Sequence, residues 1–267
     1  MRAFRIAYDG RDFHGFQRQP DVATVSDAVL DAVRDLNVLE ASDDVPPGYA
    51  AAGRTDAGVS AAAQTVAFEA PDWLTPAALN AELPADVRAW ASAAAPDDFH
   101  ATHDATARAY TYYLHAPEGA DGAAMAAIER LAGRHDFHNL TTDETGTVRD
   151  LSTGLRRDDD FLVLRFEAGG FPRQFVRRAV TVVRDVARGV ADRAFLDRVL
   201  ADDRLAGPDG IGPAPPEPLV LTDVTYPDLA FEVDADAAAS ARTVFEDREA
   251  SLAARARVAG RLREEVG

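Results

Sequence analysis

Two amino acids are missing from this sequence. Cysteine is absent, which excludes disulfide frameworks, thiolate nucleophiles and cysteine metal sites. Lysine is absent as well, so all 28 basic residues other than histidine are arginines. No apolar run approaches 18 residues, which excludes a helix that spans a membrane. The start, MRAFRIAYDG, lacks the apolar stretch of a secretory signal, and we therefore expect a cytoplasmic protein.

Negative charge, in contrast, is abundant. The 45 acidic residues against 28 basic residues give a net charge of −17 over 267 residues. Many carboxylates with no lysine indicate a GC-rich genome and a cytoplasm at molar salt, as in haloarchaea. The Debye length near 1 M salt is only about 3 Å. The acidity therefore does not exclude a nucleic acid as partner.

The hydrophobic pattern changes repeatedly between the period of strands and the period of helices. Thr24, three residues before Asp27, indicates a helix start. The pattern predicts strands over residues 3–8, 48–52, 64–68, 87–95, 108–114, 147–155, 161–166 and 219–226, and helices after Thr24, over 122–131, over 173–188 and from 245 onward.

Strands and single helices that mix without regular βαβ repetition favour an α+β fold over a doubly wound one. We predict two similar subdomains. Residues 1–103 form the first and carry the loop GRTDAGVSA. Residues 104–267 form the second, with an arginine-rich helix and a charged helical tail. We interpret the tail as a packing or solvated element.

The loop GRTDAGVSA contains the first candidate for chemistry. Asp56 stands on a turn between Gly53 and Gly58, and Arg54 precedes it by two residues. A turn aspartate often accepts hydrogen bonds from nearby backbone N–H groups and only anchors the turn. A carboxylate next to an arginine is also a candidate catalytic group. The residues alone leave both interpretations open.

A stripe of arginines is the second candidate. On a helical projection, Arg173, Arg177, Arg184 and Arg188 lie within about 60° of one another, opposite an apolar arc. Residues 165–193 carry a net charge of +4, so the rest of the chain must carry −21 to give the total of −17. Such a stripe is typical of phosphate contact. The alternative is a solvated helix face paired with surface acids.

Aromatic and histidine residues supply the remaining candidates. In ATARAYTYYL, strand alternation puts Tyr110 and Tyr112 on one face and Tyr113 on the other. They belong either to an aromatic strand core or to a site where a tyrosine ring stacks on a base. The segments FHATHD and HDFH match no compact zinc motif, so we expect no metal site.

Seven segments, in this order, make the sequence similar to the tRNA pseudouridine synthase A family. They span nearly the whole chain, and the RTDAGV core is highly specific. The segments are YDGRDFHGFQRQ (8–19), GRTDAGVSA (53–61), LNAELPADVRAW (79–90), DDFHATHDATARAYTYYL (97–114), LAGRHDFHNL (131–140), FVRRAV (175–180) and PLVLTDVTYP (218–227).

The resemblance implies a fold, a reaction and partners. The fold consists of two ferredoxin-like subdomains, similar to RNA-recognition motifs, which share one continuous antiparallel sheet with a cleft at the seam. The reaction is the isomerisation of uridine to pseudouridine at positions 38 to 40 of the anticodon stem-loop of tRNA, without cofactor or metal. The implied assembly is a homodimer with one tRNA across both protomers.

The resemblance also implies roles for individual residues. Asp56 matches the catalytic aspartate and Arg54 the motif arginine. Tyr110 matches the active-site tyrosine, Arg177 the arginine that pairs with the catalytic carboxylate, and Leu219 an apolar pocket residue. The arginine stripe would hold RNA.

Four departures from the family's usual residues lie outside this catalytic set and bear on which uridines are modified: Phe16, Ser60, Thr102 and Arg178. Three alternatives remain: a non-catalytic RNA-binding protein of the same fold, a synthase acting on other RNA uridines, and a metal-dependent hydrolase built on the His/Asp pairs.

Overall fold

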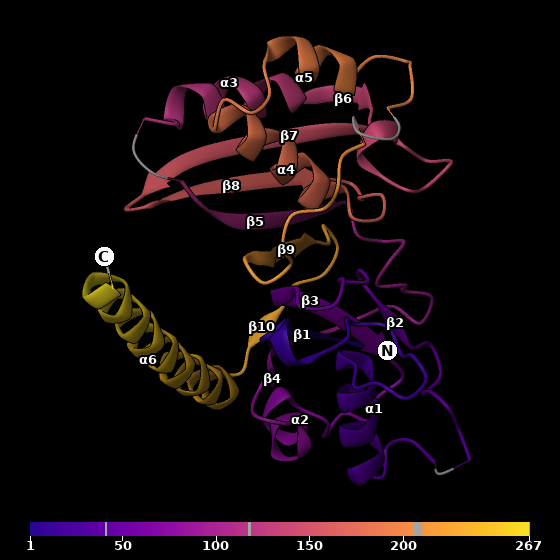
Figure 1. The fold of residues 1–267 in the computed structure, drawn as a ribbon. Coiled ribbons are helices and arrows are strands. Elements are labelled where there is room, and N and C mark those ends of the chain that lie inside the picture. The colour runs from indigo at the N-terminus through magenta and orange to yellow at the C-terminus, as the bar shows by residue number, and fades with distance from the viewer. Residues whose placement is uncertain (41, 117–118, 206–209, 267) are drawn as a thin grey trace.

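A ten-stranded sheet forms the centre of the computed structural model, which describes residues 1–40, 42–116, 119–205 and 210–266 (Figure 1). The strand order is β10-β4-β1-β3-β9-β5-β8-β7-β6, and β2 pairs with β3 beside this path. The strands are β1 (Arg2–Tyr8), β2 (Ala50–Ala51), β3 (Ser60–Phe68), β4 (Val87–Ala94), β5 (Ala107–His115), β6 (Gly133–Asp136), β7 (Val148–Asp158), β8 (Phe161–Ala168), β9 (Leu219–Thr225) and β10 (Glu232–Val233).

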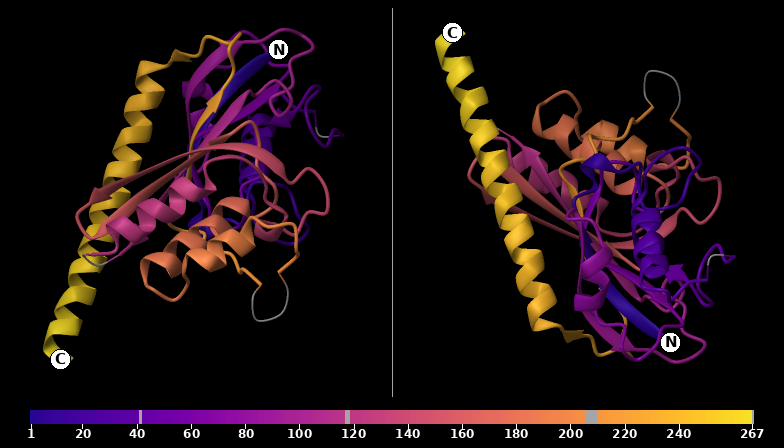
Figure 2. Two further views of the ribbon diagram at one scale, coloured as in Figure 1. Left: turned by 90° about the horizontal axis from the view of Figure 1, so that it is seen from above. Right: turned by 90° about the horizontal axis from the view of Figure 1, so that it is seen from below.

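Helices cover the sheet in both halves. The half with β4, β1 and β3 carries two helices, the half with β5, β8 and β7 carries three, and a long helix ends the chain (Figure 2). They are α1 (Val25–Asp35), α2 (Pro76–Glu82), α3 (Asp121–Leu131), α4 (Phe175–Ala187), α5 (Arg193–Val199) and α6 (Ala235–Val266), with short 3-10 turns at Gly10–Asp12 and His138–Leu140.

The strand β9 joins the two halves. It runs antiparallel to β5 on one side and parallel to β3 on the other, with Ser60 opposite Val220 and Ala61 opposite Leu221. The α+β class and the shared, continuous sheet are confirmed. The expectation that the sheet is antiparallel throughout is wrong at this pair. The antiparallel pairing with β5 sets the direction of β9. Strand β3 runs in that same direction, so β9 and β3 pair in parallel.

Two hydrophobic cores lie on the helix-covered side of the sheet. The first packs α1 against β1 and β3, and the second packs α3, α4 and α5 against β5 and β8. Leu221, Val224 and Tyr226 belong to the first core although they follow the second half in sequence. The strand β10 and helix α6 also return to β4. The division into residues 1–103 and 104–267 stays a prediction.

Local sequence explains where most elements begin. Thr24 caps α1 by accepting a hydrogen bond from the Asp27 N–H, as the spacing predicts. Thr75 and Asp192 cap the short helices α2 and α5 in the same way, and the hydrophobic pattern predicts neither helix. The strands β6 and β10 are also missed, and each is too short for a clear alternation.

Several predicted boundaries shift. Residues 48–52 form only the two-residue strand β2, and β3 begins four residues before the predicted start. The arginine-rich helix begins at Phe175 and not at Arg173, because Gln174 has a left-handed φ of 58° and ends the preceding turn. The tail helix begins ten residues before Phe245, because the Asp234 carboxylate accepts a hydrogen bond from the Ala237 N–H.

Across the described ranges, no helix combines the length and the apolar character required to cross a membrane.

Candidate active site

The loop between β2 and β3 holds Asp56 at the seam between the two halves. Asp56 and Val59 close a tight turn, in which the Val59 N–H donates to the Asp56 carbonyl over 3.1 Å. Gly58 adopts a φ of 81°, a conformation that glycine takes without strain. The buried hydroxyls of Thr55 and Tyr8 are 2.7 Å apart. The loop is thus anchored to β1 one residue before Asp56.

The segment that follows β1 packs closely against this loop. A Cβ atom on Gly10 would lie 2.0 Å from the Val59 carbonyl oxygen, and one on Gly15 would lie 2.8 Å from the Thr55 carbonyl oxygen. The Phe16 N–H donates to the Thr55 carbonyl, and the Gly58 N–H donates to the Phe13 carbonyl. The YDGRDFHGF motif therefore forms the support of the loop that carries Asp56.

Asp56 and Arg177 form an ion pair across the seam. Arg177 Nη1 donates to Asp56 Oδ2 over 2.9 Å, and the side chains are 13% and 32% exposed respectively. In the described part of the chain, Arg177 is the single hydrogen-bond donor to this carboxylate. The interpretation of Asp56 as a turn anchor requires backbone donors and is not supported. The carboxylate is held by a guanidinium and still reaches solvent.

A short strap, residues 211–216, completes the support of this pair. Arg177 Nε donates to the Ala214 carbonyl over 2.7 Å, and the Ala214 N–H donates back to the Arg177 carbonyl. A Cβ on Gly58 would lie 2.9 Å from Pro216, so the strap also contacts the loop. Helix α4, the strap and the loop together determine where the Arg177 guanidinium lies.

Tyr110 lies beside the loop on β5. A Cβ on Gly53 would lie 3.9 Å from the Tyr110 hydroxyl oxygen, and the ring packs edge-on against Phe171 with centroids 5.3 Å apart. Burial raises the pKa of Tyr110 to about 12, with a further contribution from the charge of Asp56. The phenol is therefore protonated at neutral pH. Tyr112 is buried on the same face and Tyr113 is exposed on the other, as the alternation predicts.

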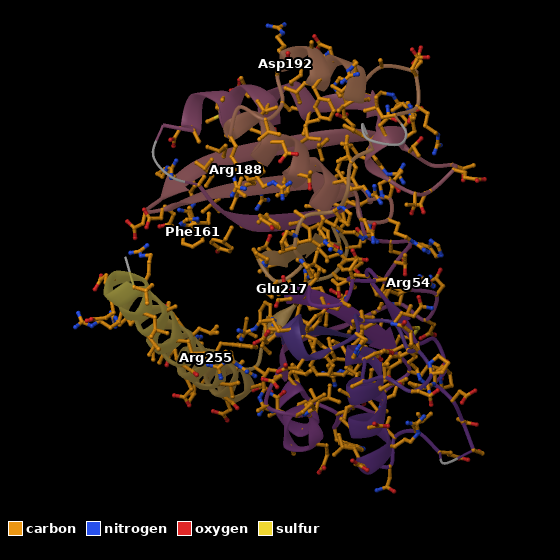
Figure 3. The ribbon with its side chains drawn as sticks, viewed as in Figure 1. Arg54, Phe161, Arg188, Asp192, Glu217 and Arg255 are labelled. Carbon is orange, nitrogen blue, oxygen red and sulfur yellow. The ribbon has the colours of Figure 1, made fainter. Side chains whose placement is uncertain are left out.

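The other predicted site residues are not gathered around the carboxylate. Arg54 is exposed at the surface (Figure 3), and within the described ranges its side chain makes no hydrogen bond or ion pair. Leu219 is 4% exposed and packs in the second core, opposite Tyr112. Their assigned roles stay predictions.

The arginine stripe is less uniform than a helical projection predicts. Arg173 precedes α4 and is exposed, and Arg177 is withdrawn into the ion pair with Asp56. Arg184 pairs with Asp185 over 2.9 Å and borders a cavity of about 740 Å³ between α4 and α5. Arg188 is exposed at the end of the helix (Figure 3). Three of the four arginines thus remain on the surface for contact with an anion.

The histidine-rich segments lie in different halves. The His100 and His103 rings lie at a tilt with centroids 4.2 Å apart, and the Asp104 carboxylate accepts a hydrogen bond from the backbone N–H of His100. His138 lies 3.4 Å from Asp136. Among the residues described, no three histidine or acidic side chains converge in a way that could hold a metal ion.

Two residues outside the predicted site support the loop. Gln64 is fully buried, and its Nε2 donates to the Gly53 carbonyl over 2.9 Å. Arg108 is buried on β5 and donates to the Ala52 carbonyl from two nitrogens. A polar residue within an otherwise apolar strand is the one signal that could have identified them.

Two α+β halves on one continuous sheet fit the pseudouridine synthase fold. The sequence profile of the family described as tRNA pseudouridine synthase matches residues 127–227.

Relatives match nearly the full length. Proteins named tRNA pseudouridine synthase A from Natronomonas pharaonis and Haloarcula marismortui are 62% and 57% identical, over 98% of this chain and 98% of each relative. One from Archaeoglobus fulgidus is 36% identical over 92% of this chain and 91% of its own length. The chain belongs to the tRNA pseudouridine synthase A family, a family of isomerases. The predicted resemblance and its haloarchaeal character are confirmed.

Proposed function

We propose that this protein converts uridine to pseudouridine at position 38, 39 or 40, or several of these, in the anticodon stem-loop of tRNA. The observation that carries the proposal is the Asp56–Arg177 ion pair at 2.9 Å across the seam of the sheet. Membership of the family and the relatives' names support tRNA as the substrate. Because its substrate is tRNA, the enzyme belongs in the cytoplasm.

The reaction breaks the C1′–N1 bond of uridine and forms a C1′–C5 bond. The uracil turns over between these steps, the C5 proton leaves, and N1 gains a proton, so no atom is added or lost overall. The base must first leave its stack, at a cost of a few kcal/mol that is lower in a loop. The protein must therefore supply an ionised group next to C1′ and a surface that holds the turning base.

Asp56 supplies the ionised group. Its carboxylate acts either as a nucleophile at C1′ or as a base at the ribose, and it is 32% exposed and so within reach of a substrate. Arg177 orients the carboxylate through the hydrogen bond from its Nη1. The guanidinium is itself held by the Ala214 carbonyl, so it stays in place while the substrate binds.

Tyr110 supplies the surface for the base. Its ring stacks on the uracil during rotation. Because its pKa is raised to about 12, its hydroxyl can accept the C5 proton only by passing its own proton on. Arg54 takes the place of the flipped base or holds a phosphate, and Arg173, Arg184 and Arg188 contact phosphates further along the RNA.

The catalytic role is tested by Asp56→Asn, Arg177→Met and the double variant. Asn keeps the volume and hydrogen bonding of the side chain but loses its charge. We expect each single variant to bind tRNA and to lose at least about 1000-fold in pseudouridine formation, and the double variant to lose little more, because residues that act as a unit are non-additive. The measurement is tritium release from C5-labelled uridine in tRNA.

Four results separate the alternatives. Near-parental turnover in Asp56→Asn would end the mechanism proposed here. No turnover in the parent, with tRNA bound, would favour a non-catalytic RNA-binding protein. Mapping pseudouridine in tRNA from a strain without this protein identifies the positions, and turnover that survives EDTA would dismiss the metal-dependent hydrolase.

We also propose that the protein is a homodimer, and helix α6 supports this. Ala241 is buried against the body, and Arg248 forms ion pairs with Asp9 and Asp86. On a helical projection the exposed side chains of Leu252, Leu262 and Val266 continue this inward line. Figure 2 shows that this part of α6 extends beyond the body. An isolated helix is marginal in water, and a second copy would cover the apolar line.

The dimer is tested by a charge placed on that line. We expect the parent to sediment as a dimer and the double variant Leu262→Arg, Val266→Asp to sediment as a monomer with its thermal midpoint nearly unchanged. Ala250→Asp, on the opposite side of α6, serves as the matched control and should remain dimeric. A parent that is monomeric at every concentration tested would refute the proposal.

A further inference from the structure

Arg108 is a buried cation whose hydrogen bonds all go to main-chain carbonyls. It is 8% exposed on β5. Its Nε and Nη2 donate to the Ala52 carbonyl over 2.9 and 2.7 Å, its Nη2 also donates to the Thr102 carbonyl over 2.6 Å, and its Nη1 donates to the Gly169 carbonyl over 2.6 Å. One guanidinium thus joins three separate segments of backbone.

This arrangement has no counter-ion. Among the residues described, no carboxylate lies within ion-pair distance of Arg108. Burial lowers the pKa of the guanidinium below its ordinary value, although an arginine keeps its proton in proteins. A buried charge is costly unless it is fully hydrogen-bonded. An apolar side chain would stabilise the strand without this cost. The role of the arginine must therefore depend on the backbone segments that its hydrogen bonds join.

The three carbonyls belong to the two sides of the active site. Ala52 directly precedes Gly53, where the loop with Asp56 begins, and Thr102 follows the strands of the first half. Arg108 itself and Gly169, which follows β8, belong to the second half. Arg108 also shares a face of β5 with Tyr110, two residues further on. Strand β5 therefore carries both Arg108, whose hydrogen bonds to the three carbonyls form a clamp on the loop, and Tyr110, whose ring lies next to the loop.

Neighbouring bonds fix the entry to the loop still further. The Ala52 N–H donates to the Thr65 carbonyl over 2.8 Å, and the next carbonyl, that of Gly53, is held by Gln64. The two backbone carbonyls before Arg54 are thus both held by buried side chains, one from each half of the molecule. The path from this entry to the Asp56 carboxylate covers only four residues.

We propose that Arg108 is a positioning residue, which sets the half carrying Asp56 against the half carrying Tyr110 and Arg177. This inference rests on the proposed function of Asp56. If the hydrogen bonds of this clamp loosen, both Asp56 and Arg177 are still present, but the carboxylate and the guanidinium no longer lie in the reactive arrangement. A displacement of about 1 Å can cost roughly 100-fold in rate.

The chain offers a matched control in Arg5. It is also 8% exposed on a strand, and it donates to the carbonyls of Val224 and Ala63, which lie outside the loop. We expect Arg108→Lys and Arg5→Lys to lower the thermal midpoint to a similar extent. The single-turnover rate of pseudouridine formation should fall roughly 100-fold in Arg108→Lys and less than about threefold in Arg5→Lys, with tRNA affinity unchanged in both.

A double-variant cycle supplies a readout that a purely structural role would not move. If Arg108 acts through the Asp56–Arg177 pair, Arg177→Met should cost much less in the Arg108→Lys background than in the parent, because the pair is already misaligned. In the Arg5→Lys background the cost of Arg177→Met should stay at its full value. Arg108→Gln replaces Arg108→Lys throughout if the lysine variant does not fold.

Two results would overturn the proposal. One is a rate in Arg108→Lys no lower than in Arg5→Lys at equal loss of thermal midpoint. The other is a cost of Arg177→Met that is the same in all three backgrounds. Asp56→Asn run in parallel separates the failures: an active Asp56→Asn ends the proposed function, whereas an inactive Asp56→Asn with a normal Arg108→Lys ends only the inference about Arg108.

Discussion

At the residue scale, the position of Asp56 depends on glycines that lie far from it in sequence. Gly10 follows β1 and packs directly on the backbone of the Asp56 loop, since a Cβ there would lie 2.0 Å from the Val59 carbonyl oxygen. A contact this short cannot relax by a side-chain rotation, because the opposing atom is backbone. The loop or the segment after β1 would have to move.

We therefore expect Gly10→Ala to be costly in both stability and rate. The free energy of unfolding should fall by about 1–3 kcal/mol, as for other overpacked sites, and pseudouridine formation should fall with it because the loop with Asp56 is displaced. Gly122→Ala is the matched control. Its Cβ would have no neighbour within 4 Å, and alanine in helix α3 should stabilise by about 0.5–1 kcal/mol. Thermal unfolding and tritium release measure both effects, and an unaffected Gly10→Ala would contradict the close packing.

At the scale of elements, helix α4 combines three functions. Its buried face, with Phe175, Val176 and Val183, packs in the second core. The side chain of Arg177 extends from the helix to Asp56, and the exposed Arg188 and half-buried Arg184 lie at the C-terminal end of the helix. One amphipathic helix thus links the core, the site and a basic surface in an acidic molecule.

The basic end of α4 should hold RNA by close contacts. We expect Arg184→Glu and Arg188→Glu each to weaken tRNA binding by roughly tenfold or more, since a favourable arginine–phosphate pair becomes a repulsive one, with little change in thermal midpoint. Arg156→Glu is the control. Arg156 is exposed on β7 and, by alternation with Arg157, which bonds Asp121 of α3, lies on the opposite face of the sheet. Parental binding by both α4 variants would show that this end of the helix is only a solvated surface.

At the scale of the whole molecule, the surface charge sets the conditions under which the protein folds. Forty-five carboxylates against 28 arginines repel one another in the compact state. The ion pairs of the structure use only part of them, and several of those pairs are exposed on both sides, such as Arg156 with Asp158 and Arg261 with Glu265. Exposed pairs contribute little to stability, so they do not offset this repulsion.

Stability should therefore depend on salt. We expect the thermal midpoint to rise steadily between about 0.1 and 3 M KCl as the ions screen the repulsion between carboxylates. Differential scanning fluorimetry across this range measures the effect. A midpoint that is flat or falls with KCl would refute the assignment to a cytoplasm at molar salt.

Sequence by itself determined much of the element content and which carboxylate is the candidate for the site. Strand alternation predicts β1, β4, β5, β8 and β9 to within about two residues, and Thr24 determines the start of α1. The RTDAGV segment identifies Asp56 before any geometry is known. These features depend on residues that are close together in the sequence, so they can be recognised from the sequence alone.

Only the tertiary structure decided what surrounds Asp56. The resemblance implies Arg177 as the partner, but the pattern of residues does not, because Arg177 is 121 residues away. The residues alone also leave Asp56 consistent with a turn anchor. The parallel pairing of β9 with β3, the clamp of Arg108 on Ala52 and the support of the loop by Gly10 likewise join segments distant in sequence. Periodicity carries no information on such contacts, because they depend on how the two halves meet and on backbone atoms that are the same in every residue.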